Sequence, residues 1–120
     1  MPMDEPILVV TAPISIDVVA DYAAAGFGDL VKAVVDVEQE IMAIGGELHA
    51  DEEALLMEHS ARQSDLWGIN LYPAEHPGPG WIEYDSMINV RPARGNRTRG
   101  VEDPDLRARI VTIVERLVVL

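Results

Sequence analysis

Four arginines lie within nine residues of this 120-residue sequence, in the stretch Arg-Pro-Ala-Arg-Gly-Asn-Arg-Thr-Arg that begins at position 91. Guanidinium groups this close together repel one another. A bound carboxylate or phosphate offsets the repulsion, because it accepts hydrogen bonds from the guanidinium fork. We therefore expect Arg97 and Arg99 to clamp an anion, with Asn96 beside them in the same loop. The alternative is that the loop pairs with the protein's own acids, Asp85, Glu102 or Asp103.

A second group of reactive side chains is Glu47, His49 and Asp51. If this segment is an extended strand, the spacing places all three on one face, about 7 Å apart. An imidazole between two carboxylates can do acid–base work or bind a divalent metal. If the segment is a helix, the shared face is lost. A solvated acidic surface is the alternative, because the spacing matches no specific metal-binding motif.

Polar and apolar residues alternate along two segments that are joined by a loop rich in proline and glycine. The polar positions are Asn70 and Tyr72 on the first segment and Glu83, Asp85, Asn89 and Arg91 on the second. Alternation of this kind predicts a β-hairpin with one face on a core. Because Asn and Asp are poor strand formers, their presence favours a pocket floor that continues into the arginine loop. An ordinary solvated sheet face is the alternative.

The elements that must position these residues follow from hydrophobic periodicity. Apolar residues at helical spacing predict a helix over residues 14–25, capped by Ser15, and a C-terminal helix after Asp103-Pro104. Runs rich in β-branched residues predict strands over residues 31–37, from residue 41, over residues 66–72 and over residues 81–91. Residues 51–59 are compatible with a helix or a strand, and we favour the strand.

These elements predict a single α+β domain over residues 1–120. We expect an antiparallel β-sheet of hairpins with the N-terminal and C-terminal helices packed on one face, a two-layer sandwich whose other face is free. The chain has 48% hydrophobic and 25% charged residues, which is typical of a globular domain of this length.

Composition excludes several classes of function. The net charge of −12 argues against general nucleic-acid binding, and the absence of cysteine excludes disulfides and thiol nucleophiles. No apolar run approaches the ~20 residues that span a bilayer, and the acidic start, residues 1–6, lacks the features of a secretory signal. We therefore expect a cytoplasmic protein with no membrane contact. The apolar end, residues 117–120, and the open sheet predict a homodimer.

Five stretches of the chain, from about Phe27 onward, resemble a prokaryotic family of small proteins of unknown function. The stretches begin at residues 32, 45, 65, 85 and 95 and read KAVVD, GGELHAD, DLWGIN, DSMIN and GNRTRGVED. The resemblance implies that the three polar groups belong to the family's own pattern. It implies no activity, because the family has no established one.

Our leading interpretation is a small enzyme or ligand-binding domain that acts on a small anionic substrate. In it Arg97 and Arg99 clamp the anion, Asp85, Asn70 and Asn89 form the pocket floor, and His49 with Glu47 or Asp51 supplies the acid–base or metal-binding group. One alternative is an acidic homodimeric module for protein–protein interaction. A further alternative is a metal-assisted phosphodiesterase or ribonuclease.

Overall fold

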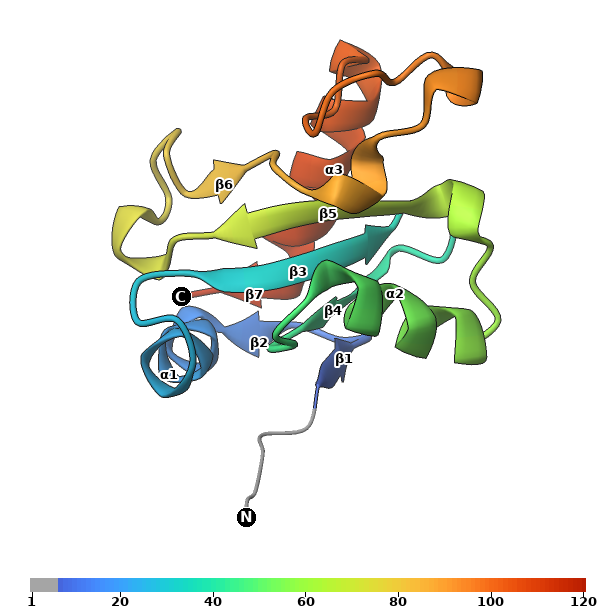
Figure 1. Cartoon of the computed structure of the whole chain (residues 1–120). Coiled ribbons are helices and arrows are strands. Elements are labelled where there is room, and N and C mark those ends of the chain that lie inside the picture. The colour runs from blue at the N-terminus through green and yellow to red at the C-terminus, as the bar shows by residue number, and fades with distance from the viewer. Residues whose placement is uncertain (1–6) are drawn as a thin grey trace.

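A computed structural model describes residues 7–120, so the acidic start of the chain lies outside the described residues. The main sheet has five strands in the order β1-β4-β3-β5-β6, and all neighbours are antiparallel (Figure 1). Their bounds are Leu8–Val10 for β1, Val31–Asp36 for β3, Ile41–Ile44 for β4, Leu66–Leu71 for β5 and Ile82–Glu83 for β6. The α+β class with an antiparallel sheet is confirmed.

The three central strands are those with the most β-branched and apolar residues, β3, β4 and β5. A tight turn joins β3 to β4. The Asp36 carboxylate stabilises it by accepting hydrogen bonds from the backbone N–H groups of Glu38 and Gln39, at 2.9 and 3.0 Å. This capping is a usual role for aspartate at a turn, and it completes the predicted strand, turn and strand.

Helices α1 (Ile16–Ala25) and α3 (Pro104–Leu117) pack on one face of the sheet, which we call the first face. Ser15 caps α1 by accepting a hydrogen bond from the N–H of Asp17, and Asp103 caps α3 in the same way through Asp105. One face of α3 is buried against the sheet, and its residues Ile110, Ile113, Val114 and Leu117 are almost inaccessible to solvent. The two helices on one face are therefore confirmed.

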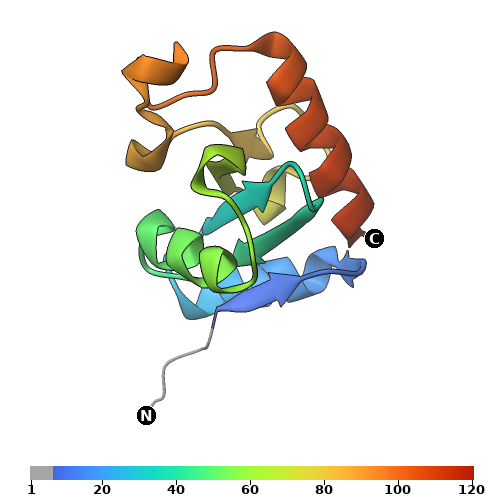
Figure 2. The ribbon, with the colours of Figure 1, turned by 90° about the vertical axis from the view of Figure 1, so that its right-hand side faces the viewer.

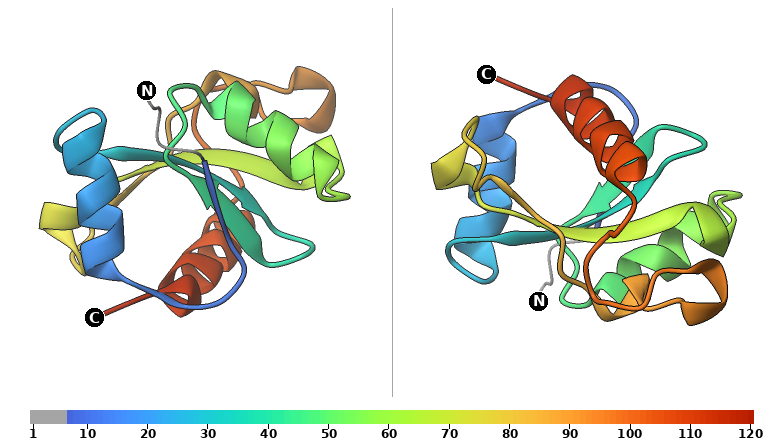
Figure 3. Two further views of the ribbon diagram at one scale, coloured as in Figure 1. Left: turned by 90° about the horizontal axis from the view of Figure 1, so that it is seen from below. Right: turned by 90° about the horizontal axis from the view of Figure 1, so that it is seen from above.

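The opposite, second face carries helix α2 (His49–Glu58), which corrects our preference for a strand over residues 51–59. Figures 2 and 3 show α2 and α3 on opposite sides of the sheet. Leu56 is fully buried in a small apolar cluster with Val34, Ala43 and Leu66. That contact with the sheet stabilises a helix whose own pattern is weakly amphipathic. The prediction that this face would be free is wrong, because α2 covers part of it.

The second strand of the predicted hairpin is much shorter than residues 81–91. Strand β6 ends at Glu83, and single 3-10 turns follow at Met87–Asn89 and Pro92–Arg94. The side-chain amide of Asn89 replaces the missing strand partner of β5. It accepts a hydrogen bond from the N–H of Gly68 at 2.8 Å and donates one to the Gly68 carbonyl at 2.9 Å. A side chain thus pairs with the edge of β5 where a second strand was expected.

A second sheet has two strands and brings the segment before α1 beside the C-terminal residues. Strand β2 (Ile14–Ser15) pairs in parallel with β7 (Val118–Val119), so the first two positions of the predicted N-terminal helix are extended. Val118 is buried, whereas Leu120 is 93% exposed. Only part of the apolar tail is therefore left for a partner, and the homodimer stays a prediction. No helix within residues 7–120 is long and apolar enough to cross a membrane.

Candidate functional site

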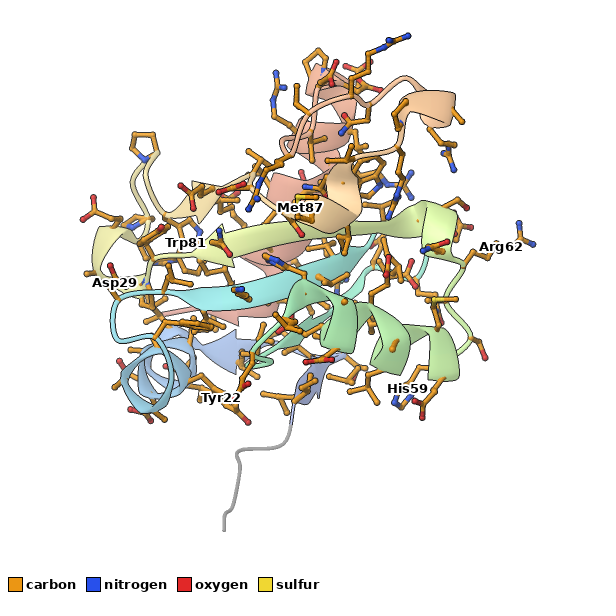
Figure 4. The ribbon with its side chains drawn as sticks, viewed as in Figure 1. Tyr22, Asp29, His59, Arg62, Trp81 and Met87 are labelled. Atoms are coloured by element: carbon orange, nitrogen blue, oxygen red, sulfur yellow. The ribbon has the colours of Figure 1, made fainter. Side chains whose placement is uncertain are left out.

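Polar side chains gather on the second face, between the start of α2 and the loop of residues 84–102. The residues of this polar cluster are Lys32, His49, Asn70, Glu83, Asp85 and Arg99. They come from β3, α2, β5, β6 and the loop, so the fold brings together segments that are far apart in the sequence. Met87, labelled in Figure 4, belongs to the 3-10 turn of this loop that lies over β5.

His49 is the first residue of α2, and its ring is largely buried, with 8% of the residue exposed. Its Nε2 lies 2.8 Å from the carbonyl oxygen of Ile69 on β5. Because a carbonyl can only accept, Nε2 carries the proton, and Nδ1 of the neutral ring is the basic atom. Burial lowers the pKa of His49, so the imidazole is neutral at pH 7.

A glycine allows the His49 ring to lie this close to the sheet. A Cβ atom at Gly68 would lie 3.1 Å from Cδ2 of His49 and 2.5 Å from Cβ of Ser86. Because Gly68 has no side chain, the His49 ring and the Ser86 side chain occupy the space above β5 at this position. This is a close approach for which only glycine has room.

Charged groups around the ring act on His49 in both directions. The positive charges of Lys32 and Arg99 lower the pKa of His49, whereas the negative charge of Asp85 raises it. Asp85 and Arg99 form an ion pair through Oδ1 and Nε at 2.5 Å, and both side chains are about half exposed. Within the described residues, the two terminal nitrogens of Arg99 make no hydrogen bond. Arg99 is thus held at one nitrogen and open at two.

Asn70 forms the floor of the cluster on β5. Its Nδ2 donates to Oε1 of Glu83 at 2.9 Å, and the hydroxyl of Tyr72 donates to the same oxygen at 3.1 Å. Its Oδ1 is buried and has no hydrogen-bond partner in residues 7–120. Lys32 lies directly opposite Asn70 in the pairing of β3 with β5. The unpaired Oδ1 of Asn70 and the cationic Lys32 therefore belong to directly paired positions of the sheet.

The side-chain amides of Asn89 and Asn96 are buried, and their hydrogen bonds are made to backbone N–H and carbonyl groups. Besides pairing with Gly68, Asn89 donates to the carbonyl of Arg99 at 2.9 Å. Nδ2 of Asn96 donates to the carbonyls of Asn89 and Gly100, and its Oδ1 accepts from the N–H of Glu102. Both residues were expected to contact a ligand. In the structure they hold the loop that carries Arg99.

The arginines of the loop do not converge on one point. Arg91 donates from Nη2 to the carbonyl of Leu66 at 2.6 Å, lies 3.6 Å from Glu53, and stacks over the ring of Trp67. Arg97 is held only through its backbone N–H, which donates to Glu102. Its guanidinium has no hydrogen bond or ion pair in the described part of the chain. Of the expected clamp, only Arg99 is placed near His49.

Glu47, His49 and Asp51 do not share a face, because helix α2 begins at His49. Of the two alternatives for this segment, the helical one holds, and it removes the shared face. Glu47 and Asp51 are exposed, and His49 alone is buried. Within residues 7–120 no group of three or more His, Asp or Glu side chains could hold a metal ion.

Sequence reasoning missed Lys32 and Glu52. Lys32 is the only lysine of the chain, and it stands inside an apolar strand, which was a usable signal. Glu52 is 0% exposed, and no pattern in the acidic segment distinguishes it from its neighbours.

One family model matches residues 8–117 of the chain, and the family is described as "Protein of unknown function (DUF5674)". Among curated proteins and among solved structures, nothing matches the chain at a significant level. The match covers every residue of the polar cluster, from Lys32 to Arg99.

Proposed function

The chain belongs to the family of unknown function DUF5674, and for this member we propose acid–base chemistry on a small anionic substrate, with His49 as the general base and Arg99 holding the anion. The observation that carries the proposal is the hydrogen bond from Nε2 of His49 to the carbonyl of Ile69. It fixes the tautomer, so Nδ1 is the atom that can accept a proton.

The lowered pKa of His49 supports the same role. A general base must be unprotonated at the working pH, and burial together with the nearby cations keeps this imidazole neutral. When Nδ1 takes a proton from the substrate, the ring becomes a cation. Asp85 is the carboxylate whose charge favours that cation, so it would stabilise the protonated state.

Arg99 is suited to an anion because Asp85 already orients it. The ion pair uses Nε, which leaves the two terminal nitrogens to donate to a carboxylate or a phosphate. The unpaired Oδ1 of Asn70 would accept a hydrogen bond from an N–H or O–H group of the same substrate. The proposal is narrower than the clamp expected from the sequence, because it needs Arg99 and not Arg97.

The first test is the state of the three histidine rings by nitrogen NMR. We expect His49 to carry its proton on Nε2 and to have a pKa below the usual value for histidine, because burial disfavours the charged ring. Inorganic phosphate should shift the His49 signals and raise the melting temperature, because a ligand of the folded state stabilises it by mass action. Arg99→Gln should remove both effects. Arg62→Gln, which removes one exposed cation elsewhere, should keep them.

Activity is the second test, on a panel of small phosphate esters and carboxylates. His49→Gln should lower turnover by about 10²–10⁴-fold, the usual contribution of a general base. The response of the melting temperature to phosphate should remain in that variant. The proposed anion site is contradicted if phosphate and chloride at matched ionic strength shift the wild-type melting temperature equally. The role of His49 as general base is contradicted if His49→Gln turns over substrate at the wild-type rate.

A further inference from the structure

A hollow of about 500 Å³ lies next to the polar cluster, between the end of α1, β3 and the turn of residues 45–48. Its walls include Tyr22, Phe27, Leu30, Lys32, Glu47 and Leu48. Figure 4 shows Tyr22 on α1, at the opposite end of the molecule from Arg62. The volume is in the range of pockets that bind small molecules.

Among residues 7–120, Lys32 is the only cation that lines this pocket, and it is the only lysine of the sequence. Its ammonium lies 5.1 Å from the centre of the Phe27 ring. Within residues 7–120 the ammonium makes no ion pair and no hydrogen bond. In a chain with 21 acidic residues, a half-buried lysine without a carboxylate partner is available to pair with an anion that enters from solvent.

Apart from Lys32 and Glu47, the side chains that line the pocket are mostly apolar or aromatic, and two of the largest are open to water. Phe27 is 51% exposed and Leu48 is 55% exposed, and both line this pocket. The turn is built to lie against Tyr22. Gly45 has a left-handed φ of +93°, and a Cβ there would lie 2.6 Å from the Tyr22 ring. A glycine is thus required both for the turn and for the wall of the pocket.

We infer that this pocket binds a small monocarboxylate with an apolar body. The carboxylate pairs with Lys32, and the apolar body covers Phe27 and Leu48, which lose their contact with water. A dianion is disfavoured because Glu47 lines the same pocket and repels the second charge. The inference goes beyond the proposed function, since it concerns binding alone and uses neither His49 nor Arg99.

Phenylacetate is the probe. Phenylacetamide, which lacks the charge, and acetate, which lacks the apolar group, are the comparison compounds. We expect phenylacetate to give saturable shifts of the backbone amide signals of Gly45 and Gly46 in NMR. Phenylacetamide should bind about fivefold more weakly, the upper end of what a partly exposed ion pair contributes. Acetate should cause no saturable shift at the same concentration.

Variants separate this pocket from the proposed catalytic group. Lys32→Met should weaken phenylacetate by the same factor and leave phenylacetamide unchanged, whereas Lys32→Arg should keep the binding. Arg62→Met removes the same charge at the far end of the molecule and should have no effect. His49→Gln should also bind phenylacetate normally, so a failure of the base does not affect this result.

Two results would overturn the inference. One is equal affinity of the wild-type protein for phenylacetate and phenylacetamide, which needs no variant to fold. The other is unchanged phenylacetate binding in Lys32→Met when its NMR spectrum is that of a folded protein. Saturable shifts confined to amides outside residues 22–48 would place the ligand elsewhere and would equally exclude this pocket.

Discussion

The two faces of the sheet differ in what the same strands place on them. On β5, Trp67, Ile69 and Leu71 join the large apolar core under α1 and α3, whereas Gly68 and Asn70 point to the second face. The apolar cluster of that second face is small, and polar residues occupy the rest. One face therefore stabilises the fold by apolar burial, and the other carries groups that can do chemistry.

On the second face, the loop of residues 84–102 holds part of the polar network in place through hydrogen bonds. Asn89 and Asn96 bond to the backbone, and Asp85 holds Arg99. A polar face of this kind depends on specific hydrogen bonds, whereas the first face depends on packed volume. The two faces should therefore respond differently to substitution.

The largest effect is expected on the first face. Ile113 is 2% exposed within the core, and Ile113→Ala should lower the free energy of unfolding by about 2–5 kcal/mol, because it removes buried methyl groups and leaves a cavity. A denaturant titration measures the loss. Leu120→Ala, at an exposed position of the same apolar end, should change it by less than about 0.5 kcal/mol. A loss below about 1 kcal/mol for Ile113→Ala would contradict the docking of α3.

A smaller loss is expected on the second face from Asn89→Ala. The substitution leaves the N–H and carbonyl of Gly68 and the carbonyl of Arg99 without this partner, and each buried unpaired group costs about 1–3 kcal/mol. We expect a total of about 2–3 kcal/mol, since water reaches part of the loop. Asn89→Asp keeps the acceptor for the N–H of Gly68, but its second oxygen faces the carbonyls of Gly68 and Arg99, so this variant should be at least as destabilised as the alanine variant. Equal stability of all three would show that Asn89 does not pair with β5.

The same contrast explains what could be predicted from the sequence. Helix α3 and the central strands follow from periodicity, which records an apolar face against a large core. Helix α2 was not favoured over a strand because its buried residues are His49, Glu52 and Leu56, and a single apolar one is too few for a helical pattern. Strand β6 was overextended because alternation cannot reveal that Asn89 would bond to Gly68 through its side chain.

The candidate site was predictable in part for a related reason. His49, Asn70, Asp85 and Arg99 stand out by residue type, and the structure brings them to one face. Their grouping depends on the start of α2 and on the loop conformation, which are tertiary features. Lys32 could have been singled out as a charge in a buried strand. Glu52 could not, because only its packing against Gly46 shows that it is buried.

The smallest effect is expected from Glu52, and it depends on pH. This carboxyl is fully buried, accepts one hydrogen bond from the N–H of Gly46, and has an Oε1 without a partner in the described residues. Burial raises the pKa of Glu52 well above the usual 4.5. Below that ordinary value both the folded and unfolded states hold the proton. As the pH rises above it, the unfolded state releases the proton first, so the folded state loses stability until its own raised pKa is passed.

Glu52→Gln removes the titrating proton and keeps an acceptor for the N–H of Gly46. The melting temperature of the variant, relative to wild type, should therefore rise as the pH increases from about 4.5 through neutrality, by a few degrees in all. Glu58→Gln, an exposed position on the same helix, changes the charge equally and should follow the wild-type profile. If the melting temperatures of the two variants depend on pH in the same way, the change in net charge explains the result, and the burial of Glu52 does not.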